Sequence, residues 1–219
     1  MIIKQAIFDL DGTLLQTMDS LIKTGNSMLN QLGFQARTSE EYRFAIGYGA
    51  KELVRRLLVL SGDLQAEGLE EAYVIYMELF DEYCTYGVKP YPGIPELISE
   101  MQKRDIALAV LTNKPHQMAQ RVLDTSFAPD TFAFVQGQDD DLPRKPDPTA
   151  AFYIAEKLGA TDFRQVLFVG DSDADMQTAV NAGMIPVGAA WGFRTVEELI
   201  ANGSEILLNE PLDLLAYLK

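Results

Sequence analysis

One short apolar strand at the start of the chain is widely separated from every other strand-like segment. Residues 2–8 are rich in Ile and Phe, as is typical of a strand buried in a parallel sheet, and Gly12 then allows a sharp turn. The next strand-like run begins only at Ile106. Because a single strand needs neighbours to satisfy its backbone hydrogen bonds, the chain must return to this strand after a long excursion.

The excursion has a helical pattern throughout. From Leu15 to about Tyr86, apolar residues recur at helical spacing in three successive runs, and no strand-like run interrupts them. Prolines and a glycine between residues 90 and 95 mark the end of this segment. We therefore predict that residues 15–87 form a small helical bundle inserted into another domain.

Strands and helices alternate after this segment. Predicted strands cover residues 106–111, 132–135, 166–169, 185–187 and 206–208, and predicted helices cover residues 94–103, 117–123, 149–158, 174–182, 196–201 and 212–218. Such alternation is typical of a parallel sheet covered by helices. A chain of 219 residues can hold such a core and a modest second domain. The prediction is an α/β fold in which residues 1–14 and 88–219 form the sheet domain.

The composition narrows the range of functions. With 32 acidic against 18 basic residues, the formal net charge of -14 disfavours binding to nucleic acid or to an anionic membrane. The single cysteine, Cys84, cannot form an internal disulfide, which fits a reducing cytosol. No secretion signal is recognisable, and no apolar stretch approaches the ~20 residues that span a bilayer. We expect a soluble, cytoplasmic protein that is either a monomer or a homodimer.

Two carboxylates, Asp9 and Asp11, directly follow the first strand. Ligands of open α/β sheets bind at the carboxyl ends of the strands, which is where these two side chains fall. Neighbouring carboxylates repel each other unless a cation, a proton or a phosphate-binding arrangement makes use of them. A solvated Asp-Gly turn is the alternative interpretation of this segment alone.

Three further segments carry polar residues at a strand end or a helix start. They are residues 112–114, with the sequence Thr-Asn-Lys, residues 144–148 around Lys145, and residues 170–175, which include Asp171 and Asp175. Each segment taken alone is an ordinary turn, loop or capped helix start. Because the strand ends of a parallel sheet share one edge, their joint occurrence indicates a single site.

Each of these residues is suited to a role in the hydrolysis of a phosphate monoester. Such esters hydrolyse extremely slowly, so a site must combine a nucleophile, an acid and charge stabilisation. We expect Asp9 to attack phosphorus and form an aspartyl-phosphate, and Asp11 to protonate the leaving alcohol and later deprotonate water. Thr112 and nearby main-chain amides would donate hydrogen bonds to the other phosphate oxygens, and Lys145 would hold both the phosphoryl group and Asp9.

The acidic residues also suit a divalent cation. Mg²⁺ prefers carboxylate and water ligands and shields an incoming anion. We therefore expect Mg²⁺ to bind Asp9, Asp171 and Asp175 together with the main-chain carbonyl of Asp11.

In this order, the four segments resemble the motifs of the haloacid dehalogenase superfamily of aspartyl-phosphate phosphohydrolases. The resembling segments are residues 8–14, 111–114, 144–146 and 169–175. The resemblance spans nearly the whole chain. It implies a Rossmann-like three-layer core, with a parallel sheet, made of residues 1–14 and 88–219, and an all-α cap of residues 15–87 that closes over the substrate.

The same resemblance assigns roles to individual residues. Asp9 matches the nucleophile and Asp11 the general acid/base, while Thr112 and Lys145 match the ligands of the phosphate and of the intermediate. Asp171 matches a metal ligand. In relatives, the position of Asp175 either ligates metal through water or orients the residue that matches Lys145.

Within the superfamily the chain looks most like phosphoglycolate phosphatases. Residues 46–53 resemble the Gly-x-Gly substrate-specificity loop of their caps, and residues 183–192 resemble their C-terminal run. A cation of the cap could meet a substrate carboxylate. The substrate-binding residues expected on this basis are Thr13, Gly47, Tyr48, Gly49, Lys51 and Asn113.

These expectations combine into a Mg²⁺-dependent phosphatase for a small phosphorylated metabolite, with 2-phosphoglycolate favoured. A β-phosphoglucomutase-like isomerase is an alternative, because it shares all four motifs but passes the phosphoryl group to a sugar. A receiver-type signalling domain also combines an acceptor Asp with acidic metal ligands, Thr and Lys. Its acceptor normally lies on an internal strand of a shorter chain without a cap, which disfavours that interpretation.

Overall fold

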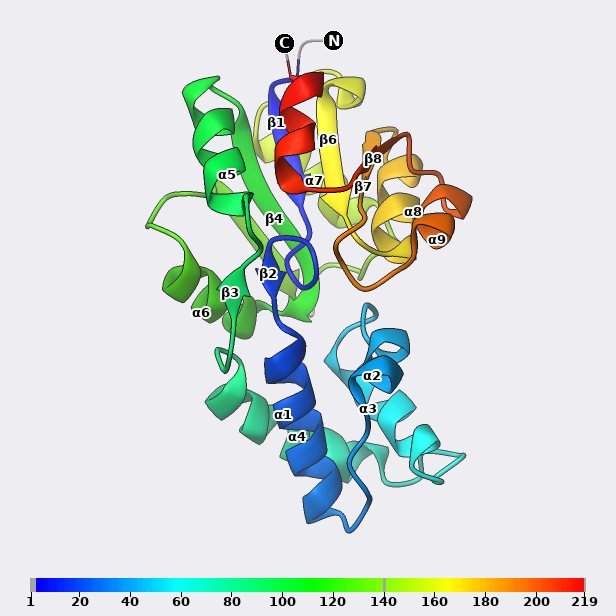
Figure 1. The fold of residues 1–219 in the computed structure, drawn as a ribbon. Coiled ribbons are helices and arrows are strands. Elements are labelled where there is room, and N and C mark those ends of the chain that lie inside the picture. Colours follow the sequence, from blue (N-terminus) through cyan, green and yellow to red (C-terminus); the bar gives the residue numbers. More distant parts are fainter. Residues whose placement is uncertain (1–2, 140, 219) are drawn as a thin grey trace.

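The six strands of the main sheet run parallel, in the order β5-β4-β1-β6-β7-β8. A computed structural model describes residues 3–139 and 141–218, so Ile2, which the sequence analysis includes in the first strand, lies outside the described residues. The strands are β1 (Gln5–Phe8), β4 (Ala107–Pro115), β5 (Phe134–Gln138), β6 (Val166–Gly170), β7 (Ile185–Ala189) and β8 (Ile206–Leu208). The predicted parallel sheet is confirmed (Figure 1).

Strand β1 lies between two strands that come about 100 and 160 residues later in the chain. Phe8, its last residue, is in register with Val110 of β4 and with Val169 of β6. The carboxyl ends of these three strands therefore lie side by side. This register brings together the polar residues that follow each strand.

Helices cover both faces of the sheet and form the two outer layers. They are α5 (Ile94–Lys103), α6 (His116–Ser126), α7 (Thr149–Lys157), α8 (Asp173–Asn181) and α9 (Val196–Ala201), with short 3-10 helices η1 (Phe163–Gln165) and η2 (Pro211–Tyr217). Ile7 packs with apolar residues of α7 and α8, whereas its neighbours Ala6 and Phe8 pack with α5 and α6. Because successive side chains of a strand point to opposite faces, one apolar run fills both halves of the core.

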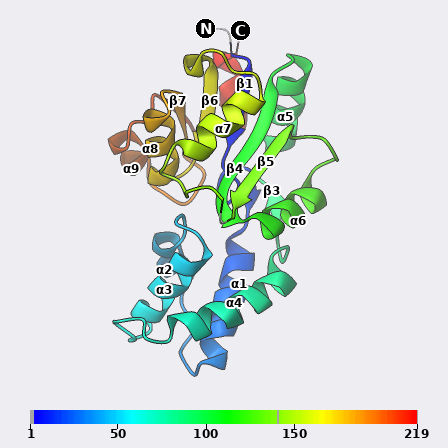
Figure 2. The same ribbon diagram turned by 180° about the vertical axis from the view of Figure 1, so that it is seen from behind.

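A separate group of helices gathers beyond the edge of the sheet at which β4 and β5 end (Figure 2). It consists of α1 (Met18–Gln31), α2 (Ser39–Ala45), α3 (Ala50–Leu60) and α4 (Leu69–Tyr83). Their buried residues recur every three or four positions, for example Leu21, Thr24 and Met28 in α1. The helical pattern predicted for this part of the chain is confirmed for these four helices.

The prediction that residues 15–87 contain no strand is wrong at its first two positions. Leu15–Gln16 form β2, which pairs antiparallel with β3 (Lys89–Pro90). These segments are the two places where the chain crosses between the sheet and the helical group. Pairing them satisfies backbone groups that would otherwise be left without partners in the crossing.

Other boundaries also differ from the prediction. Residues 112–114 lie within β4, because pairing of β4 with β5 resumes at Pro115 after an irregularity. Strand β5 begins at Phe134, two residues after the predicted start at 132. The last helical segment, from Pro211, is a 3-10 helix. Within the described residues, no helix combines the length and the apolar character needed to cross a membrane.

Candidate active site

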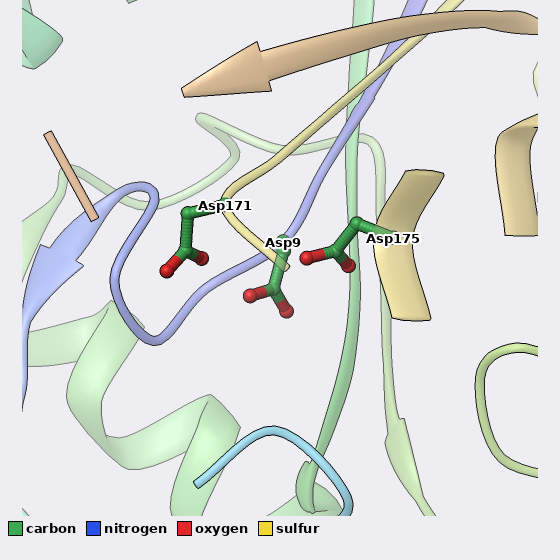
Figure 3. A group of neighbouring side chains, drawn as sticks. All are labelled: Asp9, Asp171 and Asp175. Carbon is green, nitrogen blue, oxygen red and sulfur yellow. The ribbon is translucent and has the colours of Figure 1, made fainter. Parts of the chain in front are cut away.

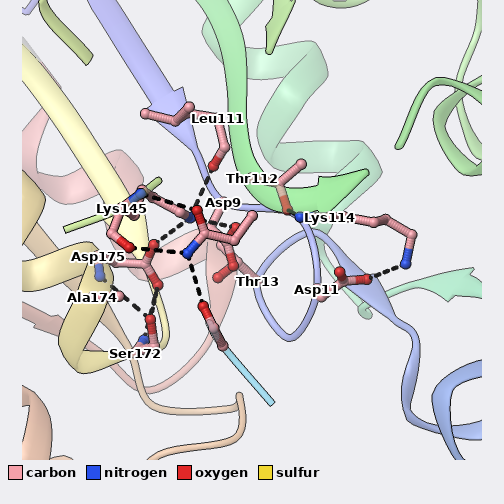
Figure 4. Close-up of polar contacts among 12 residues, drawn as sticks. Asp9, Asp11, Thr13, Leu111, Thr112, Lys114, Lys145, Ser172, Ala174 and Asp175 are labelled. Atoms are coloured by element: carbon pink, nitrogen blue, oxygen red, sulfur yellow. Dashed lines mark hydrogen bonds and ion pairs between the residues drawn. The ribbon is translucent and has the colours of Figure 1, made fainter. Parts of the chain in front are cut away.

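The four polar segments meet at the carboxyl end of β1 (Figure 4). Asp9 directly follows this strand, and its N–H donates a hydrogen bond to the carbonyl of Val169 at 2.8 Å. The side chain of Lys145 reaches the same place from the loop before α7. Thr112 lies on β4 and is buried, with 3% of its surface exposed.

Lys145 bridges two of the carboxylates. Its Nζ lies 2.6 Å from Oδ1 of Asp9 and 2.6 Å from Oδ1 of Asp175, and it donates a third hydrogen bond to the carbonyl of Leu111 at 2.9 Å. Burial alone would lower the pKa of Lys145, but the charges of Asp175 and Asp9 outweigh burial and raise it above its ordinary value. Lys145 is therefore held as a fixed cation beside Asp9.

Asp9, Asp171 and Asp175 form a buried acidic cluster (Figure 3). One oxygen of each carboxylate lies within 4.8 Å of the others. Burial, reinforced by the neighbouring carboxylates, raises the pKa of Asp9 well above its ordinary value and that of Asp171 to about 7. A single ammonium group cannot balance three carboxylates, so this oxygen-rich site suits a divalent cation such as Mg²⁺.

Asp171 is held from two sides. The hydroxyl of Thr13 donates to its Oδ1 at 2.9 Å, and the N–H of Phe193 donates to its Oδ2 at 2.7 Å. A Cβ atom at Gly12 or Gly192 would collide with this carboxylate. The turn after β1 and the loop after β7 therefore enclose Asp171 and orient it.

Asp175 uses both of its oxygens for contacts within the core. Besides the ion pair with Lys145, its Oδ2 accepts hydrogen bonds from the hydroxyl and the N–H of Ser172, at 2.6 and 3.0 Å. The Ser172 hydroxyl accepts in return from the N–H of Asp175, which completes a capping box at the start of α8. Of the two roles considered for Asp175, these contacts match orientation of Lys145.

Asp11 pairs with a cation to which the sequence analysis assigns no role. Nζ of Lys114 donates to Oδ1 of Asp11 at 2.9 Å, and the Lys114 side chain is only 1% exposed. Lys114 lies two residues after Thr112 on β4, and both residues line the pocket described below. The place of Lys114 in the same polar segment as Thr112 is the sequence signal that could have identified it.

A pocket opens between the sheet edge and the helical group. It encloses about 580 Å³, including the solvent at its mouth, and is lined by core residues such as Asp9, Asp11 and Lys145. Gly47 and Gly49 line it from the helical side. The acidic cluster and the pocket therefore form one continuous site.

Three of the expected substrate-binding residues are absent from the described lining of this pocket. The hydroxyl of Thr13 donates its hydrogen bond to Asp171. The hydroxyl of Tyr48 donates to Asp173, and Nζ of Lys51 forms an ion pair with Glu70 at 2.7 Å. The sequence could not show the ion pair of Lys51, because the direction of its side chain depends on α4, a helix that follows it in the chain.

Two core residues hold the helical group over the pocket. The amide nitrogen of Asn113 donates to the carbonyls of Gly47 at 3.0 Å and of Lys145 at 3.1 Å. Arg194 donates to the carbonyl of Ile46 at 2.7 Å and to that of Arg43. Arg194 could not be identified from the sequence, since nothing in the sequence places residue 194 beside residues 43–46.

Comparison with known proteins agrees with this geometry. A family model described as haloacid dehalogenase-like hydrolase matches residues 6–189. A phosphoglycolate phosphatase of Pseudomonas syringae pv. tomato is 35% identical over 195 residues, which cover 87% of this chain and 70% of that protein. A phosphoglycolate phosphatase of Vibrio parahaemolyticus is 30% identical over 217 residues, which cover 97% and 95% of the two chains.

Solved structures share the whole architecture. A crystal structure described as a predicted phosphoglycolate phosphatase from Haemophilus somnus has a TM-score of 0.91 and 25% identity, with 98% of this chain and 97% of that chain covered. The structure of CbbY from Rhodobacter sphaeroides in complex with phosphate has a TM-score of 0.82 and 25% identity, with 97% and 96% covered. The chain therefore belongs to the haloacid dehalogenase-like hydrolase family, as a phosphatase similar to the phosphoglycolate phosphatases.

Proposed function

We propose that this phosphatase hydrolyses a small phosphate monoester, with Mg²⁺ as cofactor, through a phosphorylated form of Asp9. The observation that carries the proposal is the position of the Asp9 carboxylate. It faces the pocket, lies 2.6 Å from the Lys145 ammonium and belongs to the acidic cluster. A nucleophile of this kind divides one difficult displacement into two easier ones.

In the first step an oxygen of Asp9 attacks phosphorus. A new O–P bond forms, the P–O bond to the alcohol breaks, and the electron pair of that bond goes to the alcohol oxygen. Asp11, which enters this step as a carboxylic acid, transfers its proton to that oxygen. Asp11 lines the same pocket as Asp9, which supports this role.

In the second step water attacks the phosphorus of the aspartyl-phosphate. The bond between Asp9 and phosphorus breaks, the Asp9 carboxylate is restored, and Asp11 takes a proton from the attacking water. Inorganic phosphate is the product. Lys145 and the Thr112 hydroxyl stabilise the charge on the phosphate oxygens in both steps.

The residues that would hold Mg²⁺ are Asp9, Asp171 and the main-chain carbonyl of Asp11. Asp175 would either contact the ion through water or orient Lys145. When bound, the ion supplies positive charge that favours the ionised forms of Asp9 and Asp171 and offsets the charge of the phosphate. The excess of buried carboxylates over the Lys145 ammonium supports this assignment.

We further propose that residues 15–87 act as a cap that opens to admit substrate and closes before phosphorylation. Closure would exclude bulk water and leave room for a single water in the second step. The hydrogen bonds from Asn113 and Arg194 to carbonyls of residues 43–47 support a closed arrangement.

We favour 2-phosphoglycolate as the substrate because the named relatives quoted above are phosphoglycolate phosphatases. The test is a panel of phosphate esters assayed with Mg²⁺, including 2-phosphoglycolate, β-glucose 1-phosphate and ethyl phosphate. Release of phosphate, with 2-phosphoglycolate preferred, is expected. Conversion of the sugar phosphate to an isomer without release of phosphate would instead support the mutase alternative.

Asp9→Asn tests the nucleophile. The amide cannot form the aspartyl-phosphate, so kcat should fall by more than about 1,000-fold. The matched control is Asp124→Asn, the same substitution on the exposed side of α6, which should leave kcat unchanged. Undiminished activity of the Asp9→Asn variant would contradict the mechanism.

A further inference from the structure

Tyr76 of α4 carries a buried hydroxyl group without a hydrogen-bond partner among the described residues. Its side chain is fully buried and lines the pocket. Burial, together with the nearby Tyr42 and Asp11, raises the pKa of Tyr76 well above its ordinary value, so the hydroxyl keeps its proton. A buried hydrogen-bond donor without an acceptor is unfavourable unless a ligand provides the acceptor.

The rest of the pocket wall on the helical side is apolar. Apart from the two glycines, the other described residues of that wall are Leu21, Ile46, Ala50, Leu53 and Phe80. Tyr76 therefore holds the one polar side-chain atom of the described cap wall. A leaving group that enters this part of the pocket meets hydrocarbon on most sides and a single hydroxyl donor.

Lys114 approaches the same region from the core. Its Nζ lies 4.7 Å from the centre of the Phe80 ring, and the rings of Phe80 and Tyr76 are 5.3 Å apart. An ammonium group has three N–H donors, and among the described residues Lys114 uses one of them, toward Asp11. Two N–H donors are thus left for a ligand, and the positive charge of Lys114 is not balanced by Asp11 when Asp11 carries the proton that it transfers in the proposed first step.

The other cations of the described pocket are already engaged. The ammonium group of Lys145 donates its three hydrogen bonds to Asp9, Asp175 and the carbonyl of Leu111. Arg194 donates to carbonyls of the cap and lies 3.5 Å from Asp173. An anionic group in the apolar part of the pocket would therefore depend on Lys114 for its counter-charge.

We propose that Lys114 and Tyr76 together bind a carboxylate on the leaving-group part of the substrate. This inference rests on the proposed phosphatase reaction and deepens it, because it assigns two residues to substrate selection beside the phosphate site. Lys114 supplies the charge and Tyr76 supplies a directed hydrogen bond. The apolar wall raises the strength of both interactions, since it excludes water from the bound carboxylate.

Binding of phosphonates, measured by calorimetry in the presence of Mg²⁺, tests the inference without turnover. The probes are 3-phosphonopropionate, in which CH₂ replaces the ester oxygen of 2-phosphoglycolate, propylphosphonate, which lacks the carboxylate, and 3-hydroxypropylphosphonate, which carries a neutral hydroxyl. The carboxylate probe should bind at least roughly tenfold more tightly than either neutral probe. Equal affinities would overturn the inference, and so would equal binding of the hydroxyl and carboxylate probes.

Tyr76→Phe should reduce the preference for the carboxylate probe by roughly fivefold to tenfold. Because its hydroxyl has no hydrogen-bond partner in the part of the chain that the structure describes, this variant should unfold at the same temperature as the parent or a higher one. The matched control is Tyr42→Phe in the same cap: Tyr42 donates to Asn26 at 3.2 Å and is not among the pocket-lining residues. It should lower the unfolding temperature and leave the preference unchanged.

Lys114→Met provides an independent second variant, which should abolish the preference for the carboxylate probe. If both variants keep the full preference, the carboxylate is bound elsewhere and the inference is wrong. Turnover of 2-phosphoglycolate is measured separately. A parent protein that prefers the carboxylate probe but releases phosphate from no ester of the panel would refute the proposed function and leave the subsite intact.

Discussion

Asp171 is buried in a place where its negative charge is unfavourable. Burial and the charge of Asp175 raise its pKa to about 7, although the N–H of Phe193 and the hydroxyl of Thr13 act in the opposite direction. A proton and a divalent cation therefore compete for this carboxylate. In the metal-free protein, the unfavourable charge of Asp171 lowers the stability of the fold. Such a loss of stability is typical of a site that binds a cation.

The first prediction concerns the pH dependence of stability in metal-free buffer. The folded pKa of Asp171, about 7, exceeds its ordinary value of 3.8, so its contribution to stability is lost as the pH rises through this interval. Asp171→Asn removes that loss. The unfolding temperature of the variant, measured by calorimetry with a chelator, should exceed that of the parent by a margin that grows by roughly 5 °C from pH 5 to pH 8.

Mg²⁺ supplies the control for this prediction. At pH 8 the ion should raise the unfolding temperature of the parent and have little effect on the Asp171→Asn variant. A margin between the two proteins that does not change with pH would show that Asp171 carries no raised pKa.

Two irregular segments around this carboxylate act as one structural unit. The turn after β1 contains Gly12 at φ +90°, and the loop after β7 donates a hydrogen bond from the indole of Trp191 to the carbonyl of Thr13 at 3.0 Å. A side chain at Gly12 would meet both the Asp171 carboxylate and the ring of Phe193. The geometry of the site thus depends on the absence of a side chain at this turn.

The second prediction compares two glycines that both have a positive φ, Gly12 and Gly33. Gly12→Ala should combine the cost of a left-handed residue with a collision, and should lower kcat by more than about tenfold because Asp171 is displaced. Gly33→Ala is the control, since Gly33 has φ +79° and open space around it. It should cost about 1 kcal/mol of stability and leave kcat unchanged. Equal effects of the two substitutions on kcat would contradict the role given to the turn.

At the scale of the whole molecule, polar contacts join the helical group to the core across the pocket. Arg194 donates to two cap carbonyls, Tyr48 donates to Asp173, and Asn113 donates to the carbonyl of Gly47. Hydrogen bonds of this kind can be exchanged for water when the two parts separate. The interface is therefore suited to repeated opening and closing.

The third prediction is that Arg194→Ala weakens cap closure. The variant should raise the KM for the substrate by roughly tenfold, because two hydrogen bonds to the cap are lost, while the unfolding temperature changes little. Limited proteolysis should also cut residues 15–87 faster than in the parent.

Arg164→Ala is the matched control for cap closure. Arg164 forms an exposed ion pair with Glu205 on the core, at 2.8 Å and away from the helical group. The KM and the rate of proteolysis should stay at the parent values in this variant. A KM for Arg194→Ala equal to that of the control would indicate that Arg194 does not hold the cap.

The parallel sheet and the order of the four polar segments around it could be predicted from the amino-acid sequence alone. Strand β1 is recognisable because its apolar run is local, and the meeting of strand ends at one edge follows from parallel topology alone. The identities of Asp9, Lys145 and Asp171 as neighbours could be predicted for that reason. The short pairing of β2 with β3 could not, because two residues carry no periodic pattern.

The directions of individual side chains follow from the folded structure. Lys51 turns toward Glu70, Lys114 reaches Asp11, and the Tyr76 hydroxyl beside the pocket has no hydrogen-bond partner among the described residues. Each of these outcomes depends on contacts between residues far apart in the chain, where a rotation about one helix axis redirects a side chain completely. The polar residues of the candidate active site could therefore be predicted from local sequence, whereas the wall of the pocket above them is set by the packing of helices α1–α4 over the sheet.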